Sequence, residues 1–177
     1  MGKMRIISGI YKGREIETPG DERTHPMGAR ERLALFNMLG PDFTGLLVLD
    51  AFAGSGAVGI EALSRGAAKV VFIEKDKKAA RVIRGNLERL GIEKSQFLLV
   101  AGDVRTVETG EKYDVVVADP PYLEFSLNLV EDLGRFLKDE GILVLSHPGE
   151  APEIAGLKLV KTRKYAQAHL SIYEKVA

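Results

Sequence analysis

From residue 46 onward, short apolar runs alternate with amphipathic segments, and this alternation restricts the fold more than any other feature of the chain. The apolar runs predict strands at residues 46–50, 69–74, 96–101, 113–118 and 141–146. Helical or turn segments separate them at residues 57–65, 77–90, 104–108 and 125–138. Strands that alternate with helices form a parallel sheet, and successive apolar residues such as Val115, Val116 and Val117 need cover on both faces. The sequence therefore predicts a doubly wound α/β fold.

Both ends of the chain extend this core. Strand-like runs at residues 158–162 and 170–174 predict an antiparallel hairpin at one edge, which makes a mainly parallel sheet of seven strands. Residues 4–18 predict a separate β-hairpin, with Gly13 supplying the positive φ that a tight turn often needs. Pro26 can open a helix that stops at Gly40. We therefore divide the chain into an N-terminal hairpin and helix, residues 1–40, and a main domain, residues 41–177.

Composition excludes several classes of protein. Lys and Arg number 25, Asp and Glu also number 25, and Cys is absent. A polyanionic partner would therefore need local basic patches, and disulfides, thiolate metal sites and a cysteine nucleophile are excluded. The sequence predicts neither a leader peptide nor a membrane-spanning segment. We expect a cytoplasmic protein, a monomer by default, that uses no membrane and no metal.

A glycine-rich turn follows the first strand of the main domain. Gly54, Gly56 and Gly59 form the pattern G-x-G-x-x-G between a strand and a helix, and Glu74 ends the next strand 20 residues after Gly54. Glycines let the backbone approach a ligand closely, the helix N-terminus offers free N–H groups, and an acid at this place can bind ribose hydroxyls. The pattern predicts a nucleoside-type cofactor but does not distinguish a dinucleotide from S-adenosylmethionine.

The fourth strand distinguishes these cofactors. It ends in Asp119, Pro120, Pro121 and Tyr122, which resembles the Asp-Pro-Pro-Tyr signature of S-adenosylmethionine-dependent methyltransferases that modify exocyclic amines. The lone pair of such an amine is delocalised into the base, so acceptors must fix the amine protons and aim the nitrogen. The Asp119 carboxylate and the Pro120 carbonyl can each accept one N–H, and the Tyr122 ring can stack on the base. We expect Asp119, Pro120 and Tyr122 to be the catalytic residues.

A wider resemblance covers nearly the whole chain. Its segments are residues 5–9, 12–14, 30–37, 50–56, 61–67 and 119–122, which are similar to those of the RsmD-type 16S ribosomal RNA guanine-N2 methyltransferases. The resemblance implies methylation of the exocyclic N2 of one guanine in the small-subunit RNA, either naked or in an assembly particle. It also implies that Asp103 binds the adenine amino group. The expected cofactor-binding residues are Asp50, Phe52, Ala53, Gly54, Ser55, Gly56, Glu74, Lys75, Asp103, Val104 and Asp119.

Local basic clusters support an RNA partner. The first fourteen residues hold four cations and no acid, and the tail holds Lys158, Lys161, Arg163 and Lys164. We expect RNA contacts from Arg5, Lys12, Arg14, Arg23, Arg30 and Arg32. The chain departs from the family pattern in having His25-Pro26-Met27 before the first helix, Leu33 within it, and Ser146 before His147. These departures bear on the target nucleotide rather than on the class of reaction.

Three other functions remain open at this point. The Asp-Pro-Pro-Tyr segment also serves adenine and cytosine methyltransferases that act on DNA or RNA. The glycines and Glu74 also permit a nicotinamide-dependent oxidoreductase, although that function leaves residues 119–122 unexplained. A non-catalytic RNA-binding assembly factor could keep the same fold without turnover.

Overall fold

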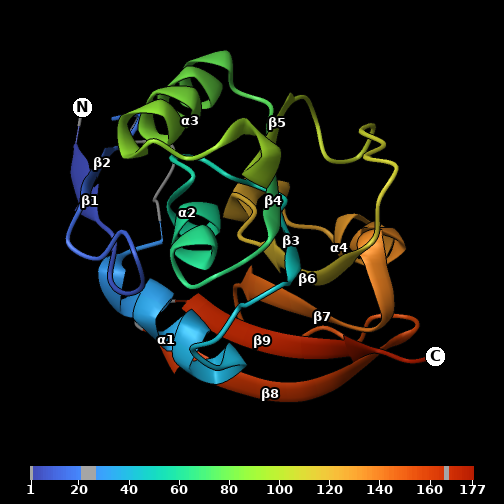
Figure 1. The fold of residues 1–177 in the computed structure, drawn as a ribbon. Helices are drawn as coiled ribbons and strands as arrows, with labels where there is room; N and C mark the ends of the chain where they lie inside the picture. The colour runs from blue at the N-terminus through green and yellow to red at the C-terminus, as the bar shows by residue number, and fades with distance from the viewer. Residues whose placement is uncertain (1, 21–26, 166–167) are drawn as a thin grey trace.

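Seven strands form one sheet in the order β5-β4-β3-β6-β7-β9-β8 in the computed structural model, which describes residues 2–20, 27–165 and 168–177 (Figure 1). The neighbouring strands from β5 to β7 pair in parallel, whereas β9 runs antiparallel to both β7 and β8. The predicted mainly parallel, seven-stranded α/β fold is therefore confirmed. The strands are β3 (Leu47–Asp50), β4 (Lys69–Glu74), β5 (Phe97–Ala101), β6 (Tyr113–Ala118), β7 (Leu137–His147), β8 (Leu157–Tyr165) and β9 (Ala168–Lys175).

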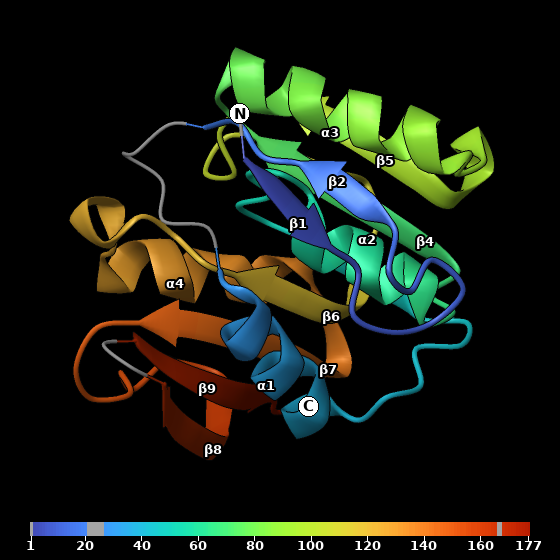
Figure 2. The ribbon, with the colours of Figure 1, turned by 90° about the vertical axis from the view of Figure 1, so that its left-hand side faces the viewer.

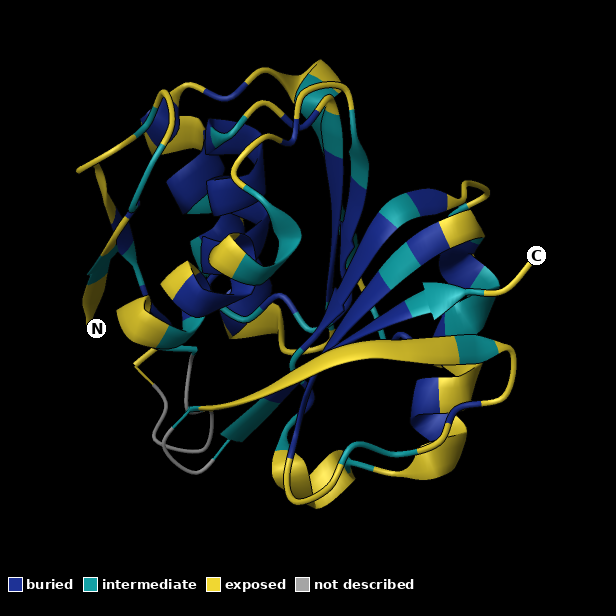
Figure 3. Ribbon diagram, turned by 90° about the horizontal axis from the view of Figure 1, so that it is seen from below, coloured by how far each residue is buried: buried dark blue, intermediate teal, exposed yellow. Residues whose placement is uncertain are grey.

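Helices cover both faces of this sheet. Along β6, Val115 and Val117 enter one core, whereas Val116 and Ala118 enter the other, as the period of two in a strand requires. The first core also takes residues from α1 (Ala29–Leu39), α2 (Ala57–Ser64) and α3 (Lys77–Leu90), and the second takes residues from α4 (Leu127–Leu133). Figure 3 shows the central strands as buried and β8 as an exposed edge. In the part of the chain that the structure describes, no helix has the length and apolar character to span a membrane.

Several predicted boundaries differ from the observed ones. The helix expected over residues 125–138 ends at Leu133, and a short 3-10 turn, η3 (Gly134–Phe136), leads into β7. The strand begins early because Leu137 already pairs with Tyr113 in β6, before a register shift. The strand expected from residue 96 starts at Phe97, because residues before it form the 3-10 turn η1 (Lys94–Gln96). Pro26, expected to open α1, lies outside the described residues, and α1 begins after Gly28.

The N-terminal hairpin packs against α2 and α3 (Figure 2). It consists of β1 (Lys3–Arg5) paired antiparallel with β2 (Glu15–Glu17), and Gly13 in the connection has a φ of 80°, as expected for a turn. The carboxylate of Glu61 on α2 accepts hydrogen bonds from the backbone N–H groups of Ile7 and Ser8, each at 2.9 Å. Ile6 and Ile16 of the hairpin also belong to the first core, so the hairpin shares its packing with the main domain.

Candidate active site at the switch point of the sheet

The strand order reverses between β3 and β6. The chain passes from β3 outward to β4 and β5, then returns to place β6 on the other side of β3. Asp50, the last residue of β3, pairs with Val117, and the N–H of Ala51 donates to the carbonyl of Val117 at 2.9 Å. The glycine-rich turn and the segment that begins with Asp119 therefore leave the sheet side by side. Ligands of open α/β sheets bind in the crevice at such a point.

Glycine occupies each of the three positions of the turn for a different physical reason. Gly54 has a φ of 56°, and a Cβ added there would meet no atom within 4 Å, so the backbone borders open space. Gly56 has a φ of 80° and is the left-handed residue that caps the start of α2. At Gly59 a Cβ would lie 2.3 Å from the Phe72 ring, so this glycine permits close packing of α2 on β4. Gly54 is thus the glycine whose backbone a ligand could approach, and Gly59 serves the packing of the helix on the sheet.

Two carboxylates hold the glycine turn in place. Glu74 accepts the N–H of Gly54 at 2.7 Å through Oε2 and the N–H of Asp76 at 2.8 Å through Oε1. Asp50 accepts the N–H of Gly59 at 3.0 Å. Burial raises the pKa of Asp50 to about 7, opposed by the Gly59 hydrogen bond and assisted by the negative charges of Glu74 and Asp119. The two predicted acids therefore hold the same turn, and the negative charge of Glu74 lies beside it.

The segment after β6 contains a second perturbed carboxylate. Burial raises the pKa of Asp119 to about 6, the neighbouring Ser146 hydroxyl acts in the opposite direction, and the charge of Glu31 adds to the rise. Burial also raises the pKa of Tyr122, again with Ser146 opposing and with Asp119 and Glu31 contributing. Pro120 is buried, and Tyr122 is 46% exposed in the 3-10 turn η2 (Tyr122–Glu124). A carboxylate with this pKa is ionised at neutral pH and can accept hydrogen bonds from a bound amine.

The other predicted cofactor residues line the neighbouring ends of β3, β4 and β5. Asp103 lies just beyond β5, where the bidentate contact with Arg105 lowers its pKa to about 2. Lys75 follows β4 and forms an ion pair with Glu124 of η2. The side chain of Val104 is buried in the second core, so only its backbone is available to a ligand. In the turn itself, Phe52 is half-buried, whereas Ala53 and Ser55 are buried.

The predicted RNA-binding cations are dispersed. Arg5 and Lys12 are exposed on the hairpin, Arg14 is exposed and donates to the carbonyl of Arg89 at 3.4 Å, and Arg30 is exposed on α1. Arg23 lies outside the described residues. These positions leave an RNA contact available to the exposed cations, but do not by themselves gather them into one patch.

Arg32 requires a correction. Its side chain is only 1% exposed, and its guanidinium donates to the carbonyl of Arg5 at 2.9 Å. Burial lowers the pKa of Arg32, with the charge of Glu61 acting in the opposite direction. The expected RNA contact of Arg32 is therefore wrong: this arginine ties α1 to the hairpin instead.

Sequence reasoning missed Glu31 and the role of Ser146. Ser146 is the penultimate residue of β7 and lies at the same end of the sheet as Asp119, so the polar residue that closes the fifth predicted strand was the signal that could have identified it. Glu31 comes from the first turn of α1, and no local pattern connects it with residues almost ninety positions away. Both residues influence Asp119 and Tyr122 from elements that lie far apart in the sequence.

The buried Asp50 carboxyl makes folding stability depend on pH. An unfolded Asp releases its proton near pH 4, whereas the folded protein retains it until about pH 7, so native stability falls as pH rises between these values. We expect Asp50→Asn, which cannot ionise, to be more stable than the wild type by at most about 4 kcal/mol at pH 8, and by only about 1 kcal/mol at pH 4.5. Urea unfolding at both pH values measures the difference. The exposed Asp139→Asn serves as control, and an equal gain at both pH values would contradict the assignment.

Comparison with known proteins gives a consistent set of relatives. The family model described as "Conserved hypothetical protein 95" matches residues 4–174. The Escherichia coli protein named ribosomal RNA small subunit methyltransferase D is 36% identical over 80% of this chain and 73% of its own length. The protein of the same name from Haemophilus influenzae is 38% identical over 73% of the chain and 68% of its own length. The solved structure of yhhF from Escherichia coli superposes with a TM-score of 0.88, at 30% identity, over 99% of both chains.

Proposed function

The chain belongs to the RsmD-type ribosomal RNA methyltransferase family, and from that premise we propose that it methylates the exocyclic N2 amine of a guanine in 16S ribosomal RNA, using S-adenosylmethionine. The observation that carries the proposal is the convergence of the Gly54 turn and the Asp119 segment at the switch point of the sheet. The Gly54 turn suits a nucleoside cofactor, and the adjacent Asp119 segment suits the amine that would receive the methyl group. Relatives named as small-subunit RNA methyltransferases support the same class of reaction.

The residues around the Gly54 turn fit S-adenosylmethionine. The backbone at Gly54 borders open space, and the negative charges of Glu74 and Asp119 lie close enough to Asp50 to raise its pKa. When bound, S-adenosylmethionine supplies a methyl group activated by its positively charged sulfonium. Glu74 would hold the ribose hydroxyls while keeping the turn in shape, and Asp103 would hold the adenine amino group. Negative charge gathered beside a cationic ligand favours its binding.

Asp119 would position the guanine amine. Its carboxylate accepts one N–H of the amine and the Pro120 carbonyl accepts the other, so the nitrogen lone pair is turned toward the methyl group. Methyl transfer would form the N–C bond as one S–C bond of the sulfonium breaks and leaves a neutral thioether. The ionised Asp119 would stabilise the positive charge that develops on the nitrogen until one amine proton passes to water. The half-exposed Tyr122 ring offers a face for the base to stack on. The amine is part of the base-pairing edge of guanine, so the target base must be unpaired or flipped out of any helix.

Ser146 would act as a positioning residue. Its side chain is buried, and its hydroxyl lies against both Asp119 and Tyr122. A hydroxyl shared by the two groups fixes their relative orientation without adding charge. The N-terminal hairpin and α1, within residues 1–40, would supply RNA contacts through the exposed Arg5, Lys12, Arg14 and Arg30.

The test is transfer of labelled methyl from S-adenosylmethionine to small ribosomal subunits that lack the modification, followed by nucleoside analysis. We expect the label in N2-methylguanosine. Label in adenosine or cytidine derivatives would replace guanine N2 with another exocyclic amine and overturn the proposed target. Binding of S-adenosylmethionine without transfer to subunits or to naked 16S RNA would indicate the non-catalytic assembly role instead.

A further inference from the structure

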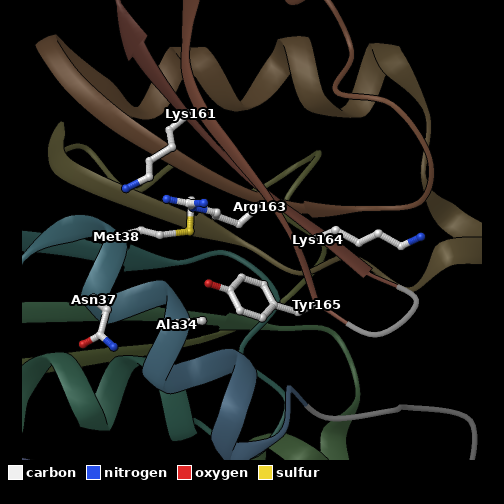
Figure 4. A pocket seen from close by; sticks show the side chains of 7 residues that line it. All are labelled: Ala34, Asn37, Met38, Lys161, Arg163, Lys164 and Tyr165. Atoms are coloured by element: carbon white, nitrogen blue, oxygen red, sulfur yellow. The ribbon is translucent and has the colours of Figure 1, made fainter.

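A basic groove lies between α1 and the edge strand β8. Its volume is about 390 Å³. One wall is the second half of α1, with Asn37 and Met38, and the other is the end of β8, with Lys161, Arg163, Lys164 and Tyr165. Figure 4 shows Lys161, Arg163 and Tyr165 pointing toward α1, whereas Lys164 extends in the opposite direction. We call this feature the α1–β8 groove.

Within the residues that the structure describes, Lys161 and Arg163 of the α1–β8 groove lack the ion pairs that Lys3 and Arg5 form on the hairpin. On the hairpin, Glu15 forms ion pairs with Lys3 and Arg5 at 3.2 and 3.0 Å. Among the described residues, no carboxylate pairs with Lys161 or Arg163, and β8 itself contains no acid. The groove therefore presents uncompensated positive charge in a chain whose formal net charge is zero. Such a local excess attracts an anionic partner.

The register of the sheet places this charge near the candidate active site. Arg163 of β8 pairs with Leu170 of β9, and Leu170 pairs with Ser146 of β7. Adjacent strands lie about 4.8 Å apart, so the backbones of Arg163 and Ser146 are separated by roughly 10 Å. Leu145 of β7 pairs with Ala118 of β6, so Ser146 and Asp119 are the next residues along two neighbouring strands. The groove therefore lies near the same end of the sheet as Asp119 and Tyr122, where we propose that the target base binds.

Helix α1 provides a second, independent connection. Glu31 in its first turn acts on the pKa values of Asp119 and Tyr122, so this end of α1 faces the candidate active site. Asn37 and Met38 follow two turns later, and a rise of 1.5 Å per residue places them about 10 Å further along the helix axis. The candidate active site therefore lies near the first turn of α1, and the groove lies beside the second half of the same helix.

We propose that the α1–β8 groove binds backbone phosphates of the RNA strand next to the target guanine; this inference rests on the proposed function. Arg163 offers a planar guanidinium suited to phosphate oxygens, and Lys161 adds a second cation on the same face of the strand. The Tyr165 hydroxyl and the Asn37 amide add neutral donors. Phosphate contacts fix the register of a nucleic acid without reading its sequence, so the groove would position the strand and leave base choice to the pocket.

The experiment compares two double variants that remove the same charges. Lys161→Gln with Arg163→Gln neutralises the groove. Lys94→Gln with Arg84→Gln neutralises two exposed cations on η1 and α3, which pack against β5 at the opposite edge of the sheet. Affinity for 16S RNA transcribed in vitro is measured over a range of salt concentrations, and methyl transfer to small subunits is measured in parallel. S-adenosylmethionine affinity and the urea midpoint check that each variant is folded.

We expect the groove variant to bind the RNA roughly 25-fold more weakly at 0.1 M salt, because each lost single-strand phosphate contact lowers the salt slope by about 0.7. The slope of log K against log salt should accordingly fall by about 1.4, and KM for the subunit should rise more than kcat falls. The Lys94 and Arg84 variant should retain nearly wild-type binding. Equal losses in the two variants, or none in the groove variant, would overturn the groove assignment. Wild-type protein that neither binds nor methylates the RNA would instead refute the proposed function.

Discussion

Asp119→Ala is expected to lower kcat for methyl transfer by about 10²- to 10³-fold, because removing one preorganised group that stabilises developing charge has an effect of this size. Asp119 is half-buried, and a water molecule that enters the variant brings no negative charge in its place. Methyl transfer to small subunits under single-turnover conditions gives the rate. Calorimetric titration with S-adenosylmethionine gives the cofactor affinity. Asp119 also borders the proposed cofactor site, but we expect the rate to fall far more than the affinity.

Asp119→Asn separates the charge from the shape of the side chain. In the wild type, the rate should fall as pH drops below about 6, because protonation near the pKa of about 6 removes the ionised acceptor. Asn keeps one carbonyl acceptor but cannot titrate, so the variant should be slow and should lack this acidic limb. An acidic limb of the same midpoint in Asp119→Asn would assign the titration to another group. A loss of cofactor affinity as large as the loss of rate would assign Asp119 to cofactor binding alone.

Sequence periodicity was sufficient for most of the fold because the central strands β3, β4 and β6 are short, apolar and bounded by turns. The expected helix at residues 77–90 has the observed bounds, since Asp76 caps its start and Gly91 in the left-handed conformation ends it. The expected helix at residues 125–138 is observed only over Leu127–Leu133, because the pairing of Leu137 with Tyr113 is a long-range contact that local propensity does not contain. Tertiary pairing therefore decided where the helix ends and where β7 begins.

Some residues of the candidate site could likewise be predicted from local sequence, and others could not. Residues of one turn, such as Gly54, could be assigned from spacing, because chain connectivity alone places them together. The burial of Arg32 could not be predicted, because an arginine on a helix faces solvent or the core according to what packs over it. Here the hairpin covers Arg32, and the carbonyl of Arg5 accepts a hydrogen bond from its guanidinium. Glu31 and Ser146 meet Asp119 only after α1 and β7 are placed in the fold. Helical periodicity predicts a buried face only when the pattern is apolar, and a buried arginine breaks that pattern.

Glu61→Ala is expected to destabilise the protein by about 3–5 kcal/mol, the cost of removing one partner from a buried charge pair. The Glu61 side chain is fully buried and accepts from the N–H groups of Ile7 and Ser8 and from Nε of Arg65 at 3.2 Å. Alanine would leave two backbone donors without their partner. It would also leave the buried Arg65 guanidinium supported mainly by the Phe36 ring, 4.4 Å away. Urea unfolding gives the size of the loss.

The position of Glu61 predicts which part of the protein opens first in the Glu61→Ala variant. Because its carboxylate joins the hairpin to α2, the amides of Ile7 and Ser8 should lose protection from hydrogen exchange before those of β3 and β6. Glu61→Gln should be intermediate, since one amide oxygen can still accept while the NH₂ group opposes a donor. The exposed Glu88→Ala on α3 is the matched control and should change stability by less than about 0.5 kcal/mol. Uniform exchange across the hairpin and the central strands would mean that Glu61 stabilises the whole domain rather than the attachment of the hairpin.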